Sequence, residues 1–428
     1  EGGVTGYAGL AATIGLNGAT IETNEVDCAE TNSWWYAYTA PATARYFVKV
    51  GLNPPLRDGA NNDFSFGVYT GDAHPLTPIS CVDDQPDVEQ DTVLLTEGTT
   101  YYLRVGARPK SATDESYVFI EQLPVVWTGA VNNDWYEAGN WQGNAVPAAN
   151  EVVVIPPSAN DPILATGNVV LASLEVQTGG VFSLAQGASL TLMGGVNGLN
   201  IEGKVNIDGG LLVGDQENNG ILSRGTIRVG PNGYMEVKGE SVDILADSLV
   251  CAGTVELRQG ALLDLNFSTT LLVEESGNIS IIDAGVIGMI ARGKTNIRGN
   301  LTVAEVLVGI IYEGEEFNIA ETGSVTVSDC GPIGIQYNQS GLEIINAGQL
   351  TVTGTAVRAI DGGTTVNTAT ATFSVAGVVD GDVSFATGSR FEVGGTDPGC
   401  VTFTLNPSLS GATVALQIEG TTACTDYD

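Results

Sequence analysis

The stretch Gly203-Lys204-Val205-Asn206-Ile207 belongs to a motif that recurs along the chain: a glycine, a variable residue, an aliphatic residue, a polar residue and a second aliphatic residue. Further copies begin at Gly225, Gly253, Gly277, Gly299, Gly323 and Gly348. These glycines follow one another at steps of 22 to 28 residues, which is the length of one coil of a solenoid. The alternation within each copy indicates a strand with one buried face. We therefore predict a right-handed parallel β-helix over residues 171–399.

A second element favours stacked coils over a sandwich in this region. The stretches Ile287-Gly288-Met289, Gly309-Ile310-Ile311 and Ile333-Gly334-Ile335 precede copies of the glycine motif at similar distances. A two-part unit that recurs in one order is typical of a solenoid, in which like residues of successive coils stack in ladders. A leucine-rich repeat has a similar period, but its L-x-x-L-x-L-x-x-N pattern is not found in this sequence.

The N-terminal part has a different composition and predicts a β-sandwich over residues 1–124. All five tryptophans and nine of the thirteen tyrosines lie in the first 141 residues. Residues 46–50 and 100–105 alternate in period two, as half-buried strands do. Clusters of Pro, Gly, Asn and Asp separate these runs, and many short strands with such spacers indicate a sandwich. The whole chain is therefore predicted to be all-β.

Four segments of this part match, in order, a family of small accessory domains. They are Asn32-Ser33-Trp34-Trp35-Tyr36-Ala37-Tyr38-Thr39, Val68-Tyr69-Thr70-Gly71, Cys81-Val82-Asp83-Asp84 and Gly98-Thr99-Thr100-Tyr101-Tyr102. Residues 20–122 thereby resemble the bacterial pre-peptidase C-terminal-like domains, which are jelly-roll sandwiches of secreted proteins. The resemblance implies a jelly-roll-like fold and a non-catalytic, accessory role.

A tryptophan-rich segment follows at residues 125–170. It contains Trp127-Thr128-Gly129, Asn133-Asp134-Trp135 and Asn140-Trp141, and it resembles the opening of β-solenoid segments in large secreted bacterial surface proteins. The first coil of a solenoid exposes an apolar end that must be covered, so we expect the three tryptophans to form a cap. The alternative is an aromatic platform on which sugars stack.

The last segment, residues 400–428, breaks the repeat. Residues 401–405 and 413–418 alternate like strands, and we expect them to form a hairpin that caps the far end of the β-helix.

The six cysteines favour an oxidising compartment and therefore a secreted protein. We expect Cys28 to pair with Cys81 in the sandwich and Cys400 to pair with Cys424 around the last strands. Cys251 and Cys330 lie about three coils apart, too far for a disulfide, so we expect free buried thiols. The chain has no CxxC pair and a single histidine, His74, which argues against a zinc site.

The net charge of −34 argues against binding partners that carry negative charge themselves. Nucleic acid and anionic membranes attract cationic proteins, so neither is an expected partner. No apolar run approaches the ~20 residues of a membrane span, and we expect no membrane insertion. An acidic surface suits solubility, divalent cations and neutral glycans.

Two loops offer oxygen ligands for calcium, the one cofactor the sequence suggests. The first contains Asp58, Asn61 and Asp63, and the second Asp83 and Asp84. Neither fits an EF-hand, and solvated loop acids are the simpler interpretation. Thr92 and Ser248 each follow an aspartate, a pattern that resembles an O-glycosylation signal of some secreted bacterial proteins.

Catalytic groups are sparse. A Ser-His-Asp or Cys-His site would have to use His74, which lies beside Pro75 in a predicted loop. The repeat region shows no adjacent aspartates and few lysines, although polysaccharide hydrolases and lyases occur on this fold. We therefore expect that the chain is not an enzyme.

The leading hypothesis is an extracellular structural protein, a homo-oligomer or homopolymer that forms a surface fibre through its ends. Residues 1–16 either add a strand to a neighbouring subunit or pack on their own domain. The first alternative is a glycan-binding adhesin that uses Trp34, Trp35, Tyr36 or the loop acids. The second is a polysaccharide-degrading β-helix enzyme.

Overall fold

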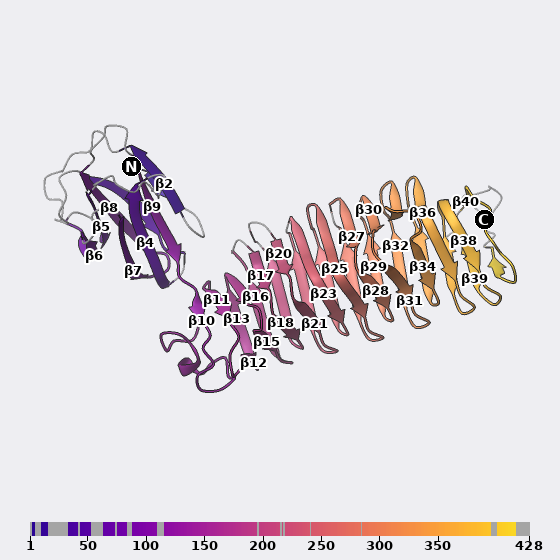
Figure 1. Ribbon diagram of the computed structural model, residues 1–428, viewed down its shortest axis with the longest axis horizontal. Helices are drawn as coiled ribbons and strands as arrows, with labels where there is room; N and C mark the ends of the chain where they lie inside the picture. Colours follow the sequence, from indigo (N-terminus) through magenta and orange to yellow (C-terminus); the bar gives the residue numbers. More distant parts are fainter. Residues whose placement is uncertain are drawn as a thin grey trace. The chain divides into compact units, whose positions relative to one another are not determined.

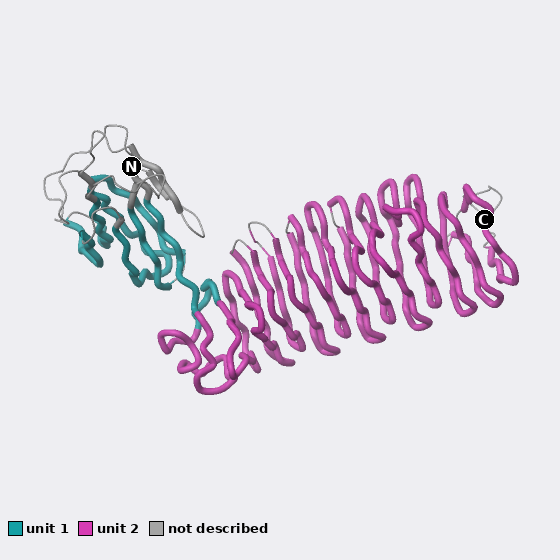
Figure 2. Tube along the Cα trace, in the orientation of Figure 1, with its two compact units in different colours: residues 1–125, 147–153 teal, residues 126–146, 154–428 magenta. Residues whose placement is uncertain are grey.

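The computed structural model describes residues 2–4, 10–15, 33–41, 43–52, 63–72, 75–83, 88–108, 115–194, 197–214, 216, 219–239, 241–283, 285–394 and 400–416. The chain divides into two compact units, residues 1–125 with 147–153 and residues 126–146 with 154–428 (Figure 2). The first unit is a two-sheet sandwich and the second is a parallel β-solenoid (Figure 1). The predicted all-β fold, with a solenoid after a sandwich, is confirmed.

Within the described residues, nine strands form the sandwich. One sheet has the order β1 (Gly2–Val4), β3 (Ser33–Thr39), β8 (Thr100–Arg108), β5 (Asp63–Thr70) and β6 (Thr77–Val82). The other has the order β2 (Leu10–Gly15), β9 (Glu115–Gln122), β4 (Ala44–Leu52) and β7 (Val88–Leu95). Both N-terminal strands pair within this unit, β1 with β3 and β2 with β9. The described parts of residues 1–16 thus pair within their own unit, and the addition of a strand to a neighbouring subunit stays a hypothesis.

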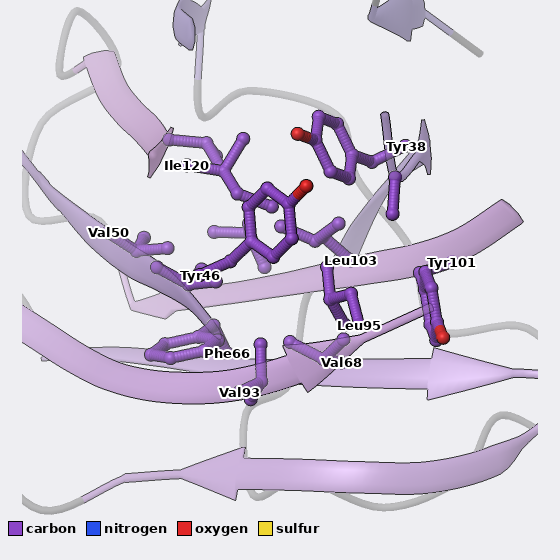
Figure 3. Packing of buried hydrophobic residues seen from close by; sticks show 14 of the residues in the cluster. Tyr38, Tyr46, Val50, Phe66, Val68, Val93, Leu95, Tyr101, Leu103 and Ile120 are labelled. Atoms are coloured by element: carbon purple, nitrogen blue, oxygen red, sulfur yellow. The ribbon is translucent and has the colours of Figure 1, made fainter. Parts of the chain in front are cut away.

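Period-two alternation places the sandwich core as the sequence predicts. Tyr38, Tyr46 and Phe66 are among the buried side chains between the sheets (Figure 3). Trp34 and Tyr36 pack against this core from β3, whereas Trp35 on the opposite face contacts Tyr69, with ring centroids 5.2 Å apart. Burial raises the pKa of Tyr36 to about 12.

The described part of the solenoid consists of two long parallel sheets (Figure 1). One has twelve strands, one from each coil: β13 (Gly167–Leu171), β16 (Ala188–Leu192), β19 (Gly210–Gly214), β22 (Tyr234–Lys238), β24 (Thr254–Arg258), β26 (Asn278–Ile282), β29 (Asn300–Ala304), β32 (Ser324–Ser328), β35 (Gln349–Thr353), β37 (Thr372–Val375), β39 (Arg390–Val393) and β41 (Thr413–Ala415).

The other sheet has twenty strands and bends around the remaining two sides of each coil. It comprises β10 (Val125–Val126), β11 (Val152–Ile155), β12 (Ile163–Leu164), β14 (Ser173–Val176), β15 (Val181–Leu184), β17 (Asn197–Ile201), β18 (Lys204–Ile207), β20 (Asn219–Ser223), β21 (Thr226–Val229), β23 (Val242–Cys251), β25 (Leu263–Val273), β27 (Ile287–Ala291), β28 (Lys294–Ile297), β30 (Val308–Tyr312), β31 (Glu316–Ile319), β33 (Ile333–Tyr337), β34 (Glu343–Asn346), β36 (Arg358–Asn367), β38 (Gly377–Phe385) and β40 (Val401–Phe403).

The glycine motif occupies two positions in the coil, not one. Gly203 and Gly225 precede β18 and β21 of the twenty-stranded sheet, whereas the copies from Gly253 onward precede strands of the twelve-stranded sheet. The 28-residue step between Gly225 and Gly253 marks the change of position. The glycine itself is required by close approach, because a β-carbon on Gly225 would overlap the carbonyl oxygen of Gly203 in the preceding coil.

The tryptophan-rich segment closes the first coil from inside. Trp127, Trp135 and Trp141 are at most 2% exposed, and Trp141 lies edge-on to both of the others, with centroids 4.9 and 4.7 Å apart. Trp135 also meets Phe182 of the next coil, 5.6 Å away. The short helix η1 (Ala138–Asn140) ends at the buried Asn140, whose Oδ1 accepts hydrogen bonds from the backbone of Val131 and Asn132. Because the rings are buried, they do not form a sugar-stacking platform.

The predicted C-terminal hairpin is wrong. Strand β40 pairs in parallel with β38, and β41 pairs in parallel with β39, so the two strands belong to one further coil. The segment between β40 and β41 is long enough to connect two sides of one coil. The alternation that suggested a hairpin fits a solenoid strand equally well. The hydroxyl of Thr404 donates to Asp380 of the preceding coil at 2.6 Å.

Candidate functional site

The last described coil of the solenoid exposes apolar side chains, one of them in register with the buried core. In the register of the twelve-stranded sheet, Val414 lies opposite Phe391, which is buried and points into the core. Val414 itself is 45% exposed, because no strand among the described residues follows β41. Leu405, Leu409 and Leu416 of the same coil are also exposed. We call Leu405, Leu409, Val414 and Leu416 the end patch.

Two properties make the end patch suited to association. Strands β40 and β41 are the outermost described members of their sheets, so each offers a backbone edge to another strand. The side chains beside these edges are apolar, and terminal solenoid coils require a cover for solubility. The tryptophan cap provides that cover at the other end, so the two ends of the solenoid differ chemically.

Two carboxyl groups lie inside the middle of the solenoid. Asp243 and Asp264 occupy equivalent positions on neighbouring strands β23 and β25, and both are 0% exposed. The same ladder position carries a small residue in the flanking coils, among them Gly220 and Gly288. A β-carbon on Gly260 would overlap Asp264 Oδ1 and lie 3.4 Å from Asp243 Oδ2, so both carboxyl groups converge on that glycine.

This pair is shielded from solvent, which limits its chemistry. Burial, followed by the negative charge of Asp283, raises the pKa of Asp264 to about 7. Neither Oδ atom of Asp264 has a hydrogen-bond partner among the described residues. A polysaccharide cannot reach a fully buried carboxyl, so the pair does not act as the acid and base of a glycosidase.

The sequence-predicted calcium ligands are only partly described. Asp58, Asn61 and Asp84 lie outside the described residues, as does His74. The backbone of Asp63 begins β5, and Asp83 is exposed after β6. Among the described side chains, no group of three or more His, Cys, Asp or Glu residues is arranged to hold a metal ion. The calcium loops and the O-glycosylation of Thr92 and Ser248, both half-buried on strands β7 and β23, stay predictions.

The cysteines divide into two groups. Cys251 and Cys330 are buried free thiols, as expected from their separation. Their Sγ atoms lie 3.3 Å from Gly253 O and 3.4 Å from Ser328 O, and burial raises their pKa to about 12 and about 11. The disulfides Cys28–Cys81 and Cys400–Cys424 stay predictions, because Cys28 and Cys424 lie outside the described residues.

No helix in the described ranges is long and apolar enough to cross a membrane.

Sequence reasoning missed the end patch because it treated residues 400–428 as a cover. It missed the aspartate pair because isolated aspartates between aliphatic residues give no signal beyond a broken alternation.

Comparison with known families gives a match over part of the chain. Residues 126–229, which contain the tryptophan cap and the first coils, match a domain of unknown function, DUF8693. The match contains none of the strands of the sandwich, so the likeness of that unit to pre-peptidase C-terminal-like domains stays a prediction. No curated protein matches the chain.

Among solved structures, the chain is similar to the catalytic unit of the thermostable GH87 α-1,3-glucanase from Streptomyces thermodiastaticus strain HF3-3. The likeness covers 94% of this chain and 97% of the glucanase unit, at 12% identity and a TM-score of 0.29. Beside this catalytic unit, the expectation that the chain is not an enzyme is withdrawn. At this TM-score the likeness supports no argument about substrate or mechanism.

Proposed function

We propose that this chain is an extracellular structural protein whose solenoid associates with a second copy through the end patch. The observation that carries the proposal is the exposure of Val414, a residue in register with the buried core ladder. An apolar rung that no described strand covers gains stability when another surface covers it, since each Å² of apolar surface removed from water contributes about 25 cal/mol.

The two ends of the solenoid determine the symmetry of this association. The buried tryptophans cover the N-terminal end of the solenoid. Among the described coils, a core position is therefore exposed at the opposite end, where the end patch lies. Two like patches that meet form an isologous contact, which closes as a dimer. A fibre would need a second adhesive surface, so stoichiometry separates a closed dimer from the open polymer that the sequence first suggested.

The charge of the chain predicts how the association responds to salt. Two copies of a protein with a net charge of −34 repel each other at low ionic strength. Salt screens this repulsion and leaves the apolar contact intact, so the association should strengthen as salt is added. An extracellular location is supported by the cysteine content and the scarcity of lysine and arginine, 16 residues in 428.

Analytical ultracentrifugation of residues 1–428 at low and high salt tests the proposal. The wild type should show a concentration-dependent dimer, and the double substitution Val414→Lys with Leu416→Lys should be monomeric. A matched control is Leu262→Lys, which changes a leucine of similar exposure, 51%, on the side of the solenoid. A wild type that stays monomeric, or a dimer that survives at the end patch and is lost in the control, would refute the assignment.

A further inference from the structure

The turns that lead into the twelve-stranded sheet alternate in length along the solenoid. Two-residue turns at 252–253, 298–299 and 347–348 are each followed, one coil later, by four-residue turns at 274–277, 320–323 and 368–371. Each longer turn is closed by a backbone hydrogen bond from its fourth residue to its first, such as Gly277 N to Glu274 O at 2.8 Å. Each shorter turn therefore lies beside a longer turn of the next coil.

In these three coil pairs a side chain of the longer turn bridges to the shorter turn. The hydroxyl of the third residue in the longer turn donates to the carbonyl of the first residue in the shorter turn. The bonds are Ser276 to Ala252 at 2.7 Å, Thr322 to Arg298 at 2.9 Å and Thr370 to Ala347 at 2.8 Å.

An earlier pair of the same kind remains open. The shorter turn is Asp208-Gly209 and the longer turn is Gly230-Pro231-Asn232-Gly233. Asn232 replaces the hydroxyl residue, and its side chain makes no corresponding bond within the described ranges. Gly230 replaces a residue with a side chain, such as Glu274 or Ala320. A β-carbon at position 230 would overlap Asp208 Oδ1, so the glycine makes room for that carboxyl group.

The result is a pocket of about 430 Å³, which is within the size range of small-molecule sites. Its polar lining comes from Ser183, Asn206, Asp208 and Arg228, and Pro231 also lines it. Asn206 Nδ2 donates to Ser183 Oγ at 3.2 Å across neighbouring strands. The carboxylate of Asp208 and the guanidinium of Arg228 have no hydrogen-bond or ion-pair partner among the described residues, although both belong to the same pocket.

These side chains select the class of ligand. An anion would be attracted by Arg228 but repelled by the Asp208 carboxylate, and a cation would be attracted by Asp208 but repelled by Arg228. A neutral molecule with several hydroxyl groups can donate to Asp208 and accept from Arg228 and Asn206 at once, because each hydroxyl is both donor and acceptor. We propose that this pocket binds a neutral saccharide, with Asp208 and Arg228 as its two charged hydrogen-bonding contacts.

Substitution of Gly230 tests whether binding depends on the position of the Asp208 carboxylate, in addition to the polar groups themselves. The substitution Gly230→Ala keeps every polar group but must displace the Asp208 carboxylate, which is the mobile end of an exposed side chain. Asp208→Ala and Arg228→Ala remove one charged contact each, and because both residues are exposed, the core should not change. Asp382→Ala and Lys294→Ala are matched controls, since both are exposed on later strands of the same sheet, outside the pocket.

Saturation-transfer difference NMR on residues 1–428 measures the binding. The probes are glucose, galactose, mannose and N-acetylglucosamine, each tested singly, with glucuronate and Ca²⁺ as charged competitors. We expect saturation transfer to at least one neutral sugar. Its affinity should fall about tenfold or more in Asp208→Ala and Arg228→Ala, as the loss of a charge-assisted hydrogen bond requires, and should also fall in Gly230→Ala. The controls should bind like the wild type.

Three results would overturn the proposal. The first is the absence of signal from every neutral sugar. The second is binding of glucuronate alone, which would indicate an anion site at Arg228. The third is neutral-sugar binding that all three pocket variants retain, which would place the sugar elsewhere on the protein.

Discussion

Replacement of Asp264 by asparagine should change the way stability depends on pH. The folded protein holds this carboxyl at 0% exposure beside Asp243, and its pKa is raised from 3.8 to about 7. In the unfolded chain the carboxyl releases its proton near its ordinary pKa. Between these two values the folded state binds more protons than the unfolded state, so the stability of the wild type falls as pH rises.

The size of the effect follows from the two pKa values. Each pKa unit corresponds to 1.36 kcal/mol, so a rise from 3.8 to about 7 corresponds to about 4 kcal/mol. Asparagine is neutral at every pH and removes this dependence. A buried amide without a partner adds about 1–3 kcal/mol of destabilisation, but that cost does not vary with pH. The measured quantity is therefore the change, between about pH 4 and about pH 8, in the stability difference between variant and wild type.

Denaturant unfolding followed by circular dichroism gives this quantity. Hydrogen exchange of peptides that span β23 and β25 reports the same change locally, because a solenoid can open coil by coil. The variant should gain about 4 kcal/mol relative to the wild type on going from about pH 4 to about pH 8. The control Glu275→Gln removes an exposed carboxyl from the next turn and should show no such change. A stability difference for Asp264→Asn that is the same at both pH values would refute the account of the buried pair.

Three further substitutions or treatments test other parts of the fold. Trp135→Ala empties a fully buried ring position at the capped end and should destabilise the solenoid by about 3–5 kcal/mol, measured by thermal unfolding, with the exposed Tyr136→Ala as control. Gly225→Ala forces a β-carbon against the backbone of the preceding coil and should lower the melting temperature, whereas Gly210→Ala, where the nearest atom is 3.6 Å away, should not. Cys251 and Cys330 should resist alkylation by iodoacetamide at about pH 8 until the chain is denatured, since the thiolate is the reactive form; rapid labelling of the native protein, read by mass spectrometry, would contradict their burial.

The sequence predicted the solenoid because its signal is repeated many times. The alternation in stretches such as 203–207 recurs in coil after coil, and steric demand at the coil contact requires the same glycine each time. The sequence could not assign each glycine to its sheet, because Gly225 and Gly253 precede strands of identical pattern on different sides of the coil. Only the irregular step between them carries that information.

The functional features depend on departures from the repeat, which are harder to recognise. Asp243 and Asp264 are 21 positions apart in the chain, and only the strand register brings them together. The pocket depends on a pair of unequal turns and on Asn232 in place of a hydroxyl residue, a difference that has meaning only beside Ser276, Thr322 and Thr370. The last coil misled sequence reasoning because parallel and antiparallel strands share the same alternation.

The position of the tryptophan cap has a consequence for how the protein is made. A ribosome or an export channel delivers the N-terminal residues first, so Trp127, Trp135 and Trp141 emerge before any complete coil follows them. Domains can fold as they are delivered, and each later coil pairs only with its neighbours. The cap thus supplies a finished template at the start of delivery, and every new coil can dock on the last one. If the coils fold in this order, unpaired strand edges remain only at the end of the chain that is still being delivered. A chain whose delivery is interrupted therefore exposes one aggregation-prone strand edge rather than two.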